Sequence, residues 1–197
     1  MIKLEQAKKL IKLARDSISC CFLDKDIEVK EDIKKEFSDV IGVFVTLNKN
    51  RELRGCIGFP EGVYPLYEGV IKAARSAAFS DPRFPAVEKE ELKDITIEIS
   101  VLTKPEKIKV KEASDYINDV KVGRDGLIVR SSFGSGLLLP QVATEYKWDS
   151  KMFLEQTCVK AGLERDSWQD IKGVSVYMFQ SQVFSETKPN DEVKQLI

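Results

Sequence analysis

Apolar residues recur at intervals of three or four positions in three segments, and each segment is predicted to form a helix. Residues 4–22 form the first, in which lysines and acidic residues separate the apolar positions of an amphipathic helix. Cys21 falls on its apolar stripe, so we expect this thiol in the core. Residues 66–80 are rich in alanine, which lets a helix pack closely on a sheet. Residues 150–161 form the third helix, and Gly162 is its expected C-cap.

Four other segments have the composition or the alternation of β-strands. Residues 40–47 are rich in β-branched side chains, and residues 52–59 follow them after a polar turn, which predicts a hairpin. Residues 95–101 alternate strictly, so that isoleucine and valine occupy one face and polar residues, among them Glu98, occupy the other. The last strand is expected over residues 174–184.

A second hairpin is expected within residues 121–130, because glycine and polar residues at 123–126 separate two short apolar runs. Hairpins and helices alternate irregularly, so we predict an α+β fold with a mixed or mainly antiparallel sheet and flanking helices. The length of 197 residues suits one domain, and no repeat or linker divides it. We therefore expect a single domain over residues 1–197, within which two lobes are allowed.

The sequence contains no histidine, and this absence excludes several common mechanisms. Without imidazole there is no Ser-His-Asp triad, no Cys-His protease pair and no histidine-ligated zinc. Any catalysis has to use thiol, carboxylate, amine, guanidinium, hydroxyl or backbone groups. The four cysteines form no CxxC pair, and the chain has no glycine-rich phosphate-binding motif, so we expect neither a metal nor a nucleotide cofactor.

Charge and hydropathy narrow the class of protein further. The chain has 31 lysines and arginines against 32 acidic residues, and this balance disfavours nucleic-acid binding, which usually needs a basic surface. No stretch approaches the ~20 apolar residues of a membrane helix. The charged amino-terminal segment does not have the pattern of a signal peptide, and the cysteine spacings do not suggest disulfides. A cytoplasmic protein is therefore expected.

The segment LRGCIG, residues 53–58, is the strongest candidate for chemistry. On an extended strand Arg54 and Cys56 project from the same face, because side chains alternate with a period of two. A guanidinium close to a thiol favours the thiolate and lowers the pKa of the cysteine, which creates a nucleophile without histidine. Gly55 and Gly58 remove side chains, so a substrate could approach the backbone there. The alternative is a buried structural cysteine in a strand whose glycines serve packing.

Two other charged residues would complete such a site. If the strand of Glu98 neighbours the LRGCIG strand, this carboxylate can pair with Arg54 or act as an acid or base. Arg83 can bring another cation to the same end of the sheet and hold an anionic group. The alternatives are a solvated sheet face for Glu98 and ordinary surface charge for Arg83.

The run LRGCIG and the segments that follow it in order make the chain resemble the AMMECR family, most of all its compact archaeal members. The matching segments are AF and DPRF between residues 78 and 84, IEISVL at 97–102, GRDGL at 123–127, GLLLPQV at 136–142, and FL to AGL between residues 153 and 163. The resemblance implies an α+β fold with a larger and a smaller lobe and a cleft between them near LRGCIG. It implies no settled biochemical activity. Related domains occur beside Memo-like and radical-SAM-like proteins, which implies a shared modification pathway.

Two hypotheses of function follow. In the first, the protein is a cysteine-dependent enzyme or a small-molecule site in which Cys56 is the thiolate, Arg54 its stabiliser or an anion clamp, and Glu98 an acid, base or orienting group. Arg83 and Gln141 would contact the substrate. In the second, LRGCIG is structural, and the protein is a regulatory or interaction module whose cleft receives a protein or peptide.

Overall fold

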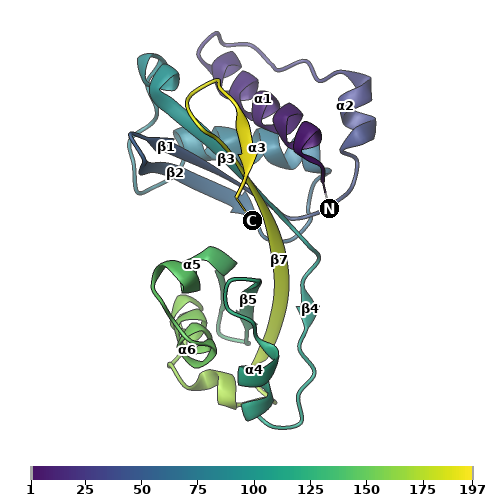
Figure 1. Ribbon diagram of the computed structural model, residues 1–197, viewed down its shortest axis with the longest axis vertical. Coiled ribbons are helices and arrows are strands. Elements are labelled where there is room, and N and C mark those ends of the chain that lie inside the picture. The colour runs from purple at the N-terminus through teal and green to yellow at the C-terminus, as the bar shows by residue number, and fades with distance from the viewer. Residues whose placement is uncertain (1, 197) are drawn as a thin grey trace. The chain divides into compact units, whose positions relative to one another are not determined.

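The computed structural model describes residues 2–196, and the chain divides into two compact units. Unit 1 comprises residues 2–102 and 182–196, and unit 2 comprises Thr103–Ser181. Unit 2 is therefore an insertion in the chain of unit 1. The strand β7 (Ser175–Glu186) begins in unit 2 and ends in unit 1. Figure 1 shows the helices and strands of both units.

Unit 1 is built on an antiparallel sheet with the strand order β2-β1-β3. Its elements are α1 (Leu4–Cys21), α2 (Glu31–Glu36), β1 (Val43–Lys49), β2 (Glu52–Phe59), α3 (Leu66–Phe79), the 3-10 helix η1 (Lys89–Asp94), β3 (Ile95–Leu102) and β8 (Val193–Gln195), which pairs with the end of β7. Helices α1 and α3 pack on one face of the sheet. The opposite face carries the polar residues of the three strands.

Strict alternation of side chains explains this two-layer packing. Val45 and Leu47 of β1 and Ile97 and Ile99 of β3 have no exposed surface, and together with the apolar stripes of α1 and α3 they form the core of unit 1. The predicted amino-terminal helix, the alanine-rich helix, the hairpin and the alternating strand are all confirmed. Cys21 is an exception to the prediction, because it is exposed at the last residue of α1, beyond the part of the helix that reaches the core.

Unit 2 has its own antiparallel sheet, in the order β6-β5-β7-β4, and its own core. Its elements are β4 (Glu106–Lys107), α4 (Ser114–Asp119), β5 (Asp125–Arg130), β6 (Ser135–Leu138), α5 (Pro140–Glu145), α6 (Ser150–Lys160), the 3-10 helix η2 (Ser167–Gln169) and the first part of β7. Phe153 and Leu154 of α6 pack against Leu127 and Val129 of β5 in this core. Gly162, with a φ of +76°, follows the C-terminus of α6, as predicted.

The predicted hairpin within residues 121–130 is wrong. The chain before the turn forms the helix α4 and does not pair with β5, whose hairpin partner is the following strand β6. The turn is instead closed by Asp125, the fully buried first residue of β5. Its carboxylate accepts hydrogen bonds from the backbone N–H of Lys121 and from the guanidinium of Arg124. The sequence indicates the turn itself, whereas the strand that pairs with β5 depends on contacts farther along the chain.

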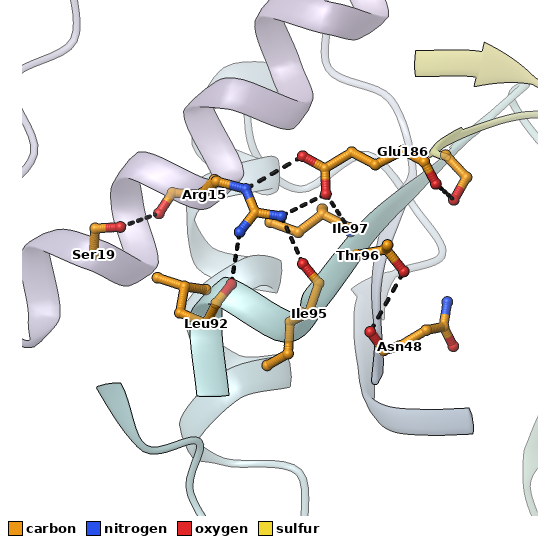
Figure 2. Close-up of polar contacts among 9 residues, drawn as sticks. Arg15, Ser19, Asn48, Leu92, Ile95, Thr96, Ile97 and Glu186 are labelled. Atoms are coloured by element: carbon orange, nitrogen blue, oxygen red, sulfur yellow. Dashed lines mark hydrogen bonds and ion pairs between the residues drawn. The ribbon is translucent and has the colours of Figure 1, made fainter. Parts of the chain in front are cut away.

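A buried ion pair ties the end of β7 to α1 (Figure 2). The guanidinium of Arg15 donates to both carboxylate oxygens of Glu186 and to the backbone carbonyls of Leu92 and Ile95, at 3.0 and 2.7 Å. Glu186 also accepts a hydrogen bond from the backbone N–H of Ile97 at 2.8 Å. Because both charges are paired and hydrogen-bonded, their burial is compensated.

The architecture confirms the predicted α+β class with an antiparallel sheet and flanking helices. None of the helices in residues 2–196 combines the length and the apolar composition that crossing a bilayer requires.

Candidate functional site

LRGCIG lies on β2, the edge strand of the unit 1 sheet. The strand register aligns Cys56 of β2 with Thr46 of β1, and Thr46 with Glu98 of β3. Directly paired residues of an antiparallel sheet share a face, so these three side chains form one row on the face opposite α1 and α3. The Thr46 hydroxyl donates a hydrogen bond to Cys56 Sγ at 3.2 Å. The tertiary structure thus brings Cys56 and Glu98 to the same face, with one residue between them.

Arg54 does not continue this row, because β2 contains a β-bulge. Gly55 pairs with Leu47, while Leu53 pairs with the next residue, Asn48, so Arg54 is the extra residue of the bulged strand. A bulge changes the direction of the side chain it contains. The bulge interrupts the alternation between Leu53 and Arg54 and leaves Arg54 without a directly paired residue on β1.

The guanidinium of Arg54 binds the segment that leads into β3. It donates to both carboxylate oxygens of Glu91, at 3.1 and 2.9 Å, and to the carbonyls of Pro85 and Ala86. Lys49 donates to the same carboxylate at 2.9 Å. These bonds hold the pKa of Glu91 down at about 2, chiefly through Arg54. The guanidinium of Arg54 is thus held by η1, and it is not among the main charges that act on the Cys56 thiol. The predicted lowering of the pKa of this thiol is wrong, because burial raises that pKa.

Burial raises the pKa of the Cys56 thiol above its ordinary value. The hydrogen bond from Thr46 and the positive charge of Arg83 oppose this effect, whereas the negative charges of Glu98 and Asp81 add to it. The thiol is therefore protonated at neutral pH in the resting protein. Arg83 is the cation with the largest effect on the sulfur.

Asp81 and Arg83 bind the backbone of Cys56 at the open edge of the sheet. The N–H of Cys56 donates to Asp81 Oδ2 at 2.9 Å, and Arg83 Nη2 donates to the carbonyl of Cys56 at 3.2 Å. Arg83 also donates to both oxygens of Asp81, at 3.0 and 2.7 Å, which keeps the pKa of this buried carboxyl well below its usual range. The two side chains satisfy the backbone groups that an edge strand leaves unpaired and fix the position of Cys56.

Sequence reasoning identified Arg83 but missed Asp81. The available signal was the Asp-Pro-Arg sequence directly after the alanine-rich helix, since an aspartate there commonly accepts the backbone N–H two residues later. The structure contains that bond, from the N–H of Arg83 to Asp81 Oδ1 at 3.1 Å.

The two glycines of the motif serve close packing. A Cβ atom on Gly55 would lie 2.1 Å from the carbonyl oxygen of Ala77, so its absence lets α3 approach the sheet. A Cβ on Gly58 would lie 2.4 Å from the ring of Phe44. These contacts support the packing alternative for both glycines, and the close approach of a substrate to them stays a prediction.

Gln141 belongs to unit 2, on the first turn of α5. Its side-chain Oε1 is buried and accepts no hydrogen bond from another described residue. Its contact with a substrate, and the cleft that the resemblance implies, stay predictions. In the part of the chain that the structure describes, no cluster of three or more cysteine or acidic side chains could hold a metal ion.

Comparisons with known proteins show which family this chain is similar to. The model of the AMMECR1 family matches residues 11–184. A protein of Methanothermobacter thermautotrophicus is 49% identical over 183 residues, which are 92% of this chain and 95% of that protein. A protein of Thermococcus gammatolerans is 49% identical over 199 residues, 98% of this chain and 96% of its own length. The crystal structure of an uncharacterized protein from Pyrococcus horikoshii superposes with a TM-score of 0.92 at 46% identity and covers 98% of both chains. The names of these relatives assign no biochemical function.

Proposed function

The chain belongs to the AMMECR1 family, and on that premise we propose that the polar face of β2, β1 and β3 is a thiol-dependent small-molecule site. The observation that carries the proposal is the row of Cys56, Thr46 and Glu98 on one face. It combines a nucleophile, a hydroxyl and a carboxylate on a sheet whose opposite face is packed by two helices. Side chains on such a rigid element need little reorganisation when a substrate binds.

A protonated thiol needs a base when it reacts, and Glu98 is the proposed base. Adjacent strands are about 4.8 Å apart, so the row spans a distance that a glutamate side chain and the Thr46 hydroxyl can bridge. The charge of Glu98 already acts on the sulfur, since it contributes to the raised pKa of Cys56. In the proposed step, the Thr46 O–H turns from the sulfur to Glu98, so that the thiol proton passes to the Thr46 oxygen as the Thr46 proton passes to Glu98, and the sulfur forms a bond to an electrophilic carbon of the ligand. The displaced electron pair goes to the leaving group, and Glu98 returns its proton to a basic leaving group or, where the leaving group is chloride, to water.

The remaining predicted site residues receive different roles. Arg83, whose side chain is 53% exposed, is proposed to stabilise the thiolate as it forms and to contact an anionic part of the ligand. Arg54 is proposed as a positioning residue that acts through Glu91. Gln141, whose buried Oε1 has no hydrogen-bond partner among the described residues, stays the substrate contact predicted from the sequence.

Covalent labelling of Cys56 tests this proposal. Small electrophilic chloroacetamides are screened by peptide-resolved mass spectrometry, with iodoacetamide as a reagent that has no affinity for the site. Glu98→Gln removes a negative charge near the sulfur, so the pKa of Cys56 falls and iodoacetamide reacts faster at neutral pH. The same variant lacks the base, so compounds that bind at the site react about 10²-fold more slowly. Opposite changes in the two rates are the expected result.

Controls are available within the chain. Glu52→Gln makes the same chemical change at an exposed position of β2 and should alter neither rate. Labelling of the exposed Cys21 shows that each reagent is active. The buried Cys158, whose pKa burial raises to about 11, should stay unlabelled while the protein is folded. If every compound labels Cys56 at the rate that its thiolate fraction alone predicts, in both the parent and Glu98→Gln, the catalytic proposal is wrong.

A second function is supported by the bonds that Asp81 and Arg83 make to the Cys56 backbone. These bonds, and the packing of Gly55 and Gly58, give most of LRGCIG a structural role that needs no ligand. We propose as the alternative a non-catalytic interaction module. Cys56→Ser separates the two: a structural thiol predicts a loss of about 1 kcal/mol in the free energy of unfolding with any partner binding retained, and a nucleophile predicts lost reactivity with little change in stability.

The cellular context is also part of the proposal. The cysteine spacing and the charge pattern of the sequence support a cytoplasmic location. The resemblance supports a pathway shared with Memo-like and radical-SAM-like proteins. Co-purification of an affinity-tagged chain from a host that encodes all three would test that association, and the tagged Cys56→Ser variant would show whether it depends on the thiol.

A further inference from the structure

A row of exposed lysines lies along the edge of the unit 2 sheet. Lys107 on β4, and Lys109 and Lys111 beyond it, alternate with Ile108 and Val110. Ile108 is buried in the unit 2 core and Val110 packs against it, so the three lysines face away from that core. Alternate residues of an extended chain are about 7 Å apart. We call Lys107, Lys109 and Lys111 the lysine row.

The strand under this row has a free edge. β4 pairs with β7 through Glu106 and Lys107, and the N–H of Ile108 donates to the Val176 carbonyl at 2.9 Å. Because the backbone groups of Ile108 point toward β7, those of its neighbour Lys107 point away from the sheet. Within residues 103–181, β7 is the one strand that pairs with β4, and Figure 1 shows the two side by side. A backbone donor and a backbone acceptor are thus offered next to the first lysine of the row.

The lysine row is poorly neutralised by its surroundings. Within residues 2–196 none of its three ammonium groups makes an ion pair. Glu106 shares the face of Ile108 and so points away from the lysines. Asp115, which accepts hydrogen bonds from the backbone N–H of Lys111 and of its neighbour, offsets only the last lysine. Lys107 and Lys109 are therefore the centre of the positive charge.

Lysines elsewhere in the chain are arranged differently. Those of the helices are commonly placed one turn from a carboxylate of the same helix, as Lys12 is from Asp16 and Lys34 is from Glu31. A lysine on an edge strand also prevents unwanted pairing with another strand. That role accounts for Lys107, but Lys109 and Lys111 lie beyond the last ladder hydrogen bond, where no strand edge needs protection. A row of repelling charges at regular spacing therefore calls for another explanation.

We propose that the lysine row is a docking surface for an acidic, extended segment of a partner protein. Carboxylates at every second residue of such a segment would match the spacing of the lysines, and its backbone could pair with the free N–H and carbonyl of Lys107. A nucleic acid fits less well, because the chain has a net charge of −1 and the continuous negative charge of a polynucleotide would extend beyond three lysines. The proposal is independent of the thiol site.

Fluorescence anisotropy with a defined probe tests the docking surface. The probe is a short fluorescein-labelled peptide in which Glu and Thr alternate, and its matched control peptide alternates Lys and Thr. We expect the acidic probe alone to bind, with an affinity that falls as salt is added. The double variant Lys107→Glu/Lys109→Glu should bind it at least tenfold more weakly. The double variant Lys160→Glu/Lys172→Glu, at two other exposed lysines of unit 2, should change the affinity less than twofold.

Each other outcome overturns the proposal. Absence of binding by the parent protein, or equal loss in the two double variants, would mean that the row is no specific surface. Tighter binding of a labelled single-stranded oligonucleotide, lost in Lys107→Glu/Lys109→Glu, would assign the row to nucleic acid instead. An unchanged thermal transition and unchanged Cys56 labelling in the variants show that a loss of binding is not a loss of folding.

Discussion

At the scale of single residues, two carboxylates anchor the LRGCIG strand, and both are held ionised. Asp81 binds the backbone of Cys56, and Glu91 binds Arg54 and Lys49. Arginine is the main partner in each case, because its guanidinium donates to both oxygens of a carboxylate at once. The positions of Cys56 and Arg54 thus depend on Asp81 and Glu91, two carboxylates that lie outside LRGCIG.

These anchors make stability depend on pH in a defined direction. The pKa of Glu91 is about 2 in the folded protein, chiefly because of Arg54, and about 4.3 in an unfolded chain. Ionised Glu91 therefore stabilises the fold above about pH 4.3, and this stabilisation is lost as the pH falls toward about 2. We predict a free energy of unfolding that declines over this interval and a smaller decline in Glu91→Gln, measured by urea denaturation at several pH values.

Glu5→Gln is the control for this pH dependence, because Glu5 makes only an exposed ion pair on the first turn of α1. Its variant should follow the parent protein at every pH. A decline in Glu91→Gln as steep as in the parent would show that the Arg54 and Glu91 contact does not contribute to acid sensitivity.

The limits of sequence prediction at this scale are illustrated by Arg54 and Arg83. The sequence selected Arg54, two residues away on the same strand, as the cation beside the Cys56 thiol, whereas Arg83 is the cation with the largest effect on the sulfur. The bulge at Arg54 depends on pairing with β1, and the approach of Arg83 depends on a bond between residues 25 positions apart. Neither follows from the local period of the side chains.

At the scale of elements, the contact between α3 and β2 depends on Gly55. No side chain fits there, because a Cβ would lie 2.1 Å from the backbone oxygen of Ala77 and backbone atoms cannot rotate away. We predict that Gly55→Ala lowers the free energy of unfolding by about 3 kcal/mol, since the helix must move off the sheet. Urea denaturation followed by circular dichroism measures this loss.

Gly162→Ala is the matched control for that substitution. Gly162 has a φ of +76° and open space around it, so alanine there meets backbone strain without a clash, at a cost of about 1 kcal/mol. A Gly55→Ala variant no less stable than Gly162→Ala would contradict the packing role. The comparison also separates two uses of glycine: close packing at Gly55 and a left-handed backbone conformation at Gly162.

At the scale of the whole molecule, unit 2 interrupts the chain of unit 1, and the returning strand has to be held in place. Arg15 and Glu186, 171 positions apart, provide a buried connection between α1 and the end of β7 (Figure 2). Breaking a buried pair on one side leaves a charge without its partner. We predict that Arg15→Met lowers the free energy of unfolding by about 3–5 kcal/mol in chemical denaturation.

The double variant Arg15→Met/Glu186→Met should lose less than the sum of the two single losses, because it leaves no buried charge behind. Lys12→Met, which breaks a solvent-exposed pair with Asp16, should cost less than about 1 kcal/mol. Additive losses in the double variant would mean that the two side chains stabilise the protein separately and not as a pair.

The sequence by itself determined the elements with a clear period: the amphipathic and alanine-rich helices, the first hairpin and the alternating strand, and with them the α+β class. Its motifs also indicated the family and directed attention to Cys56 and Glu98. Only the tertiary structure decided the register that aligns these two residues through Thr46, the bonds of Arg54 to Glu91, and the bonds of Asp81 to the strand edge. The physical reason is that side-chain periodicity is a local property of the chain, whereas register, bulges and edge contacts are fixed by segments that meet only on folding.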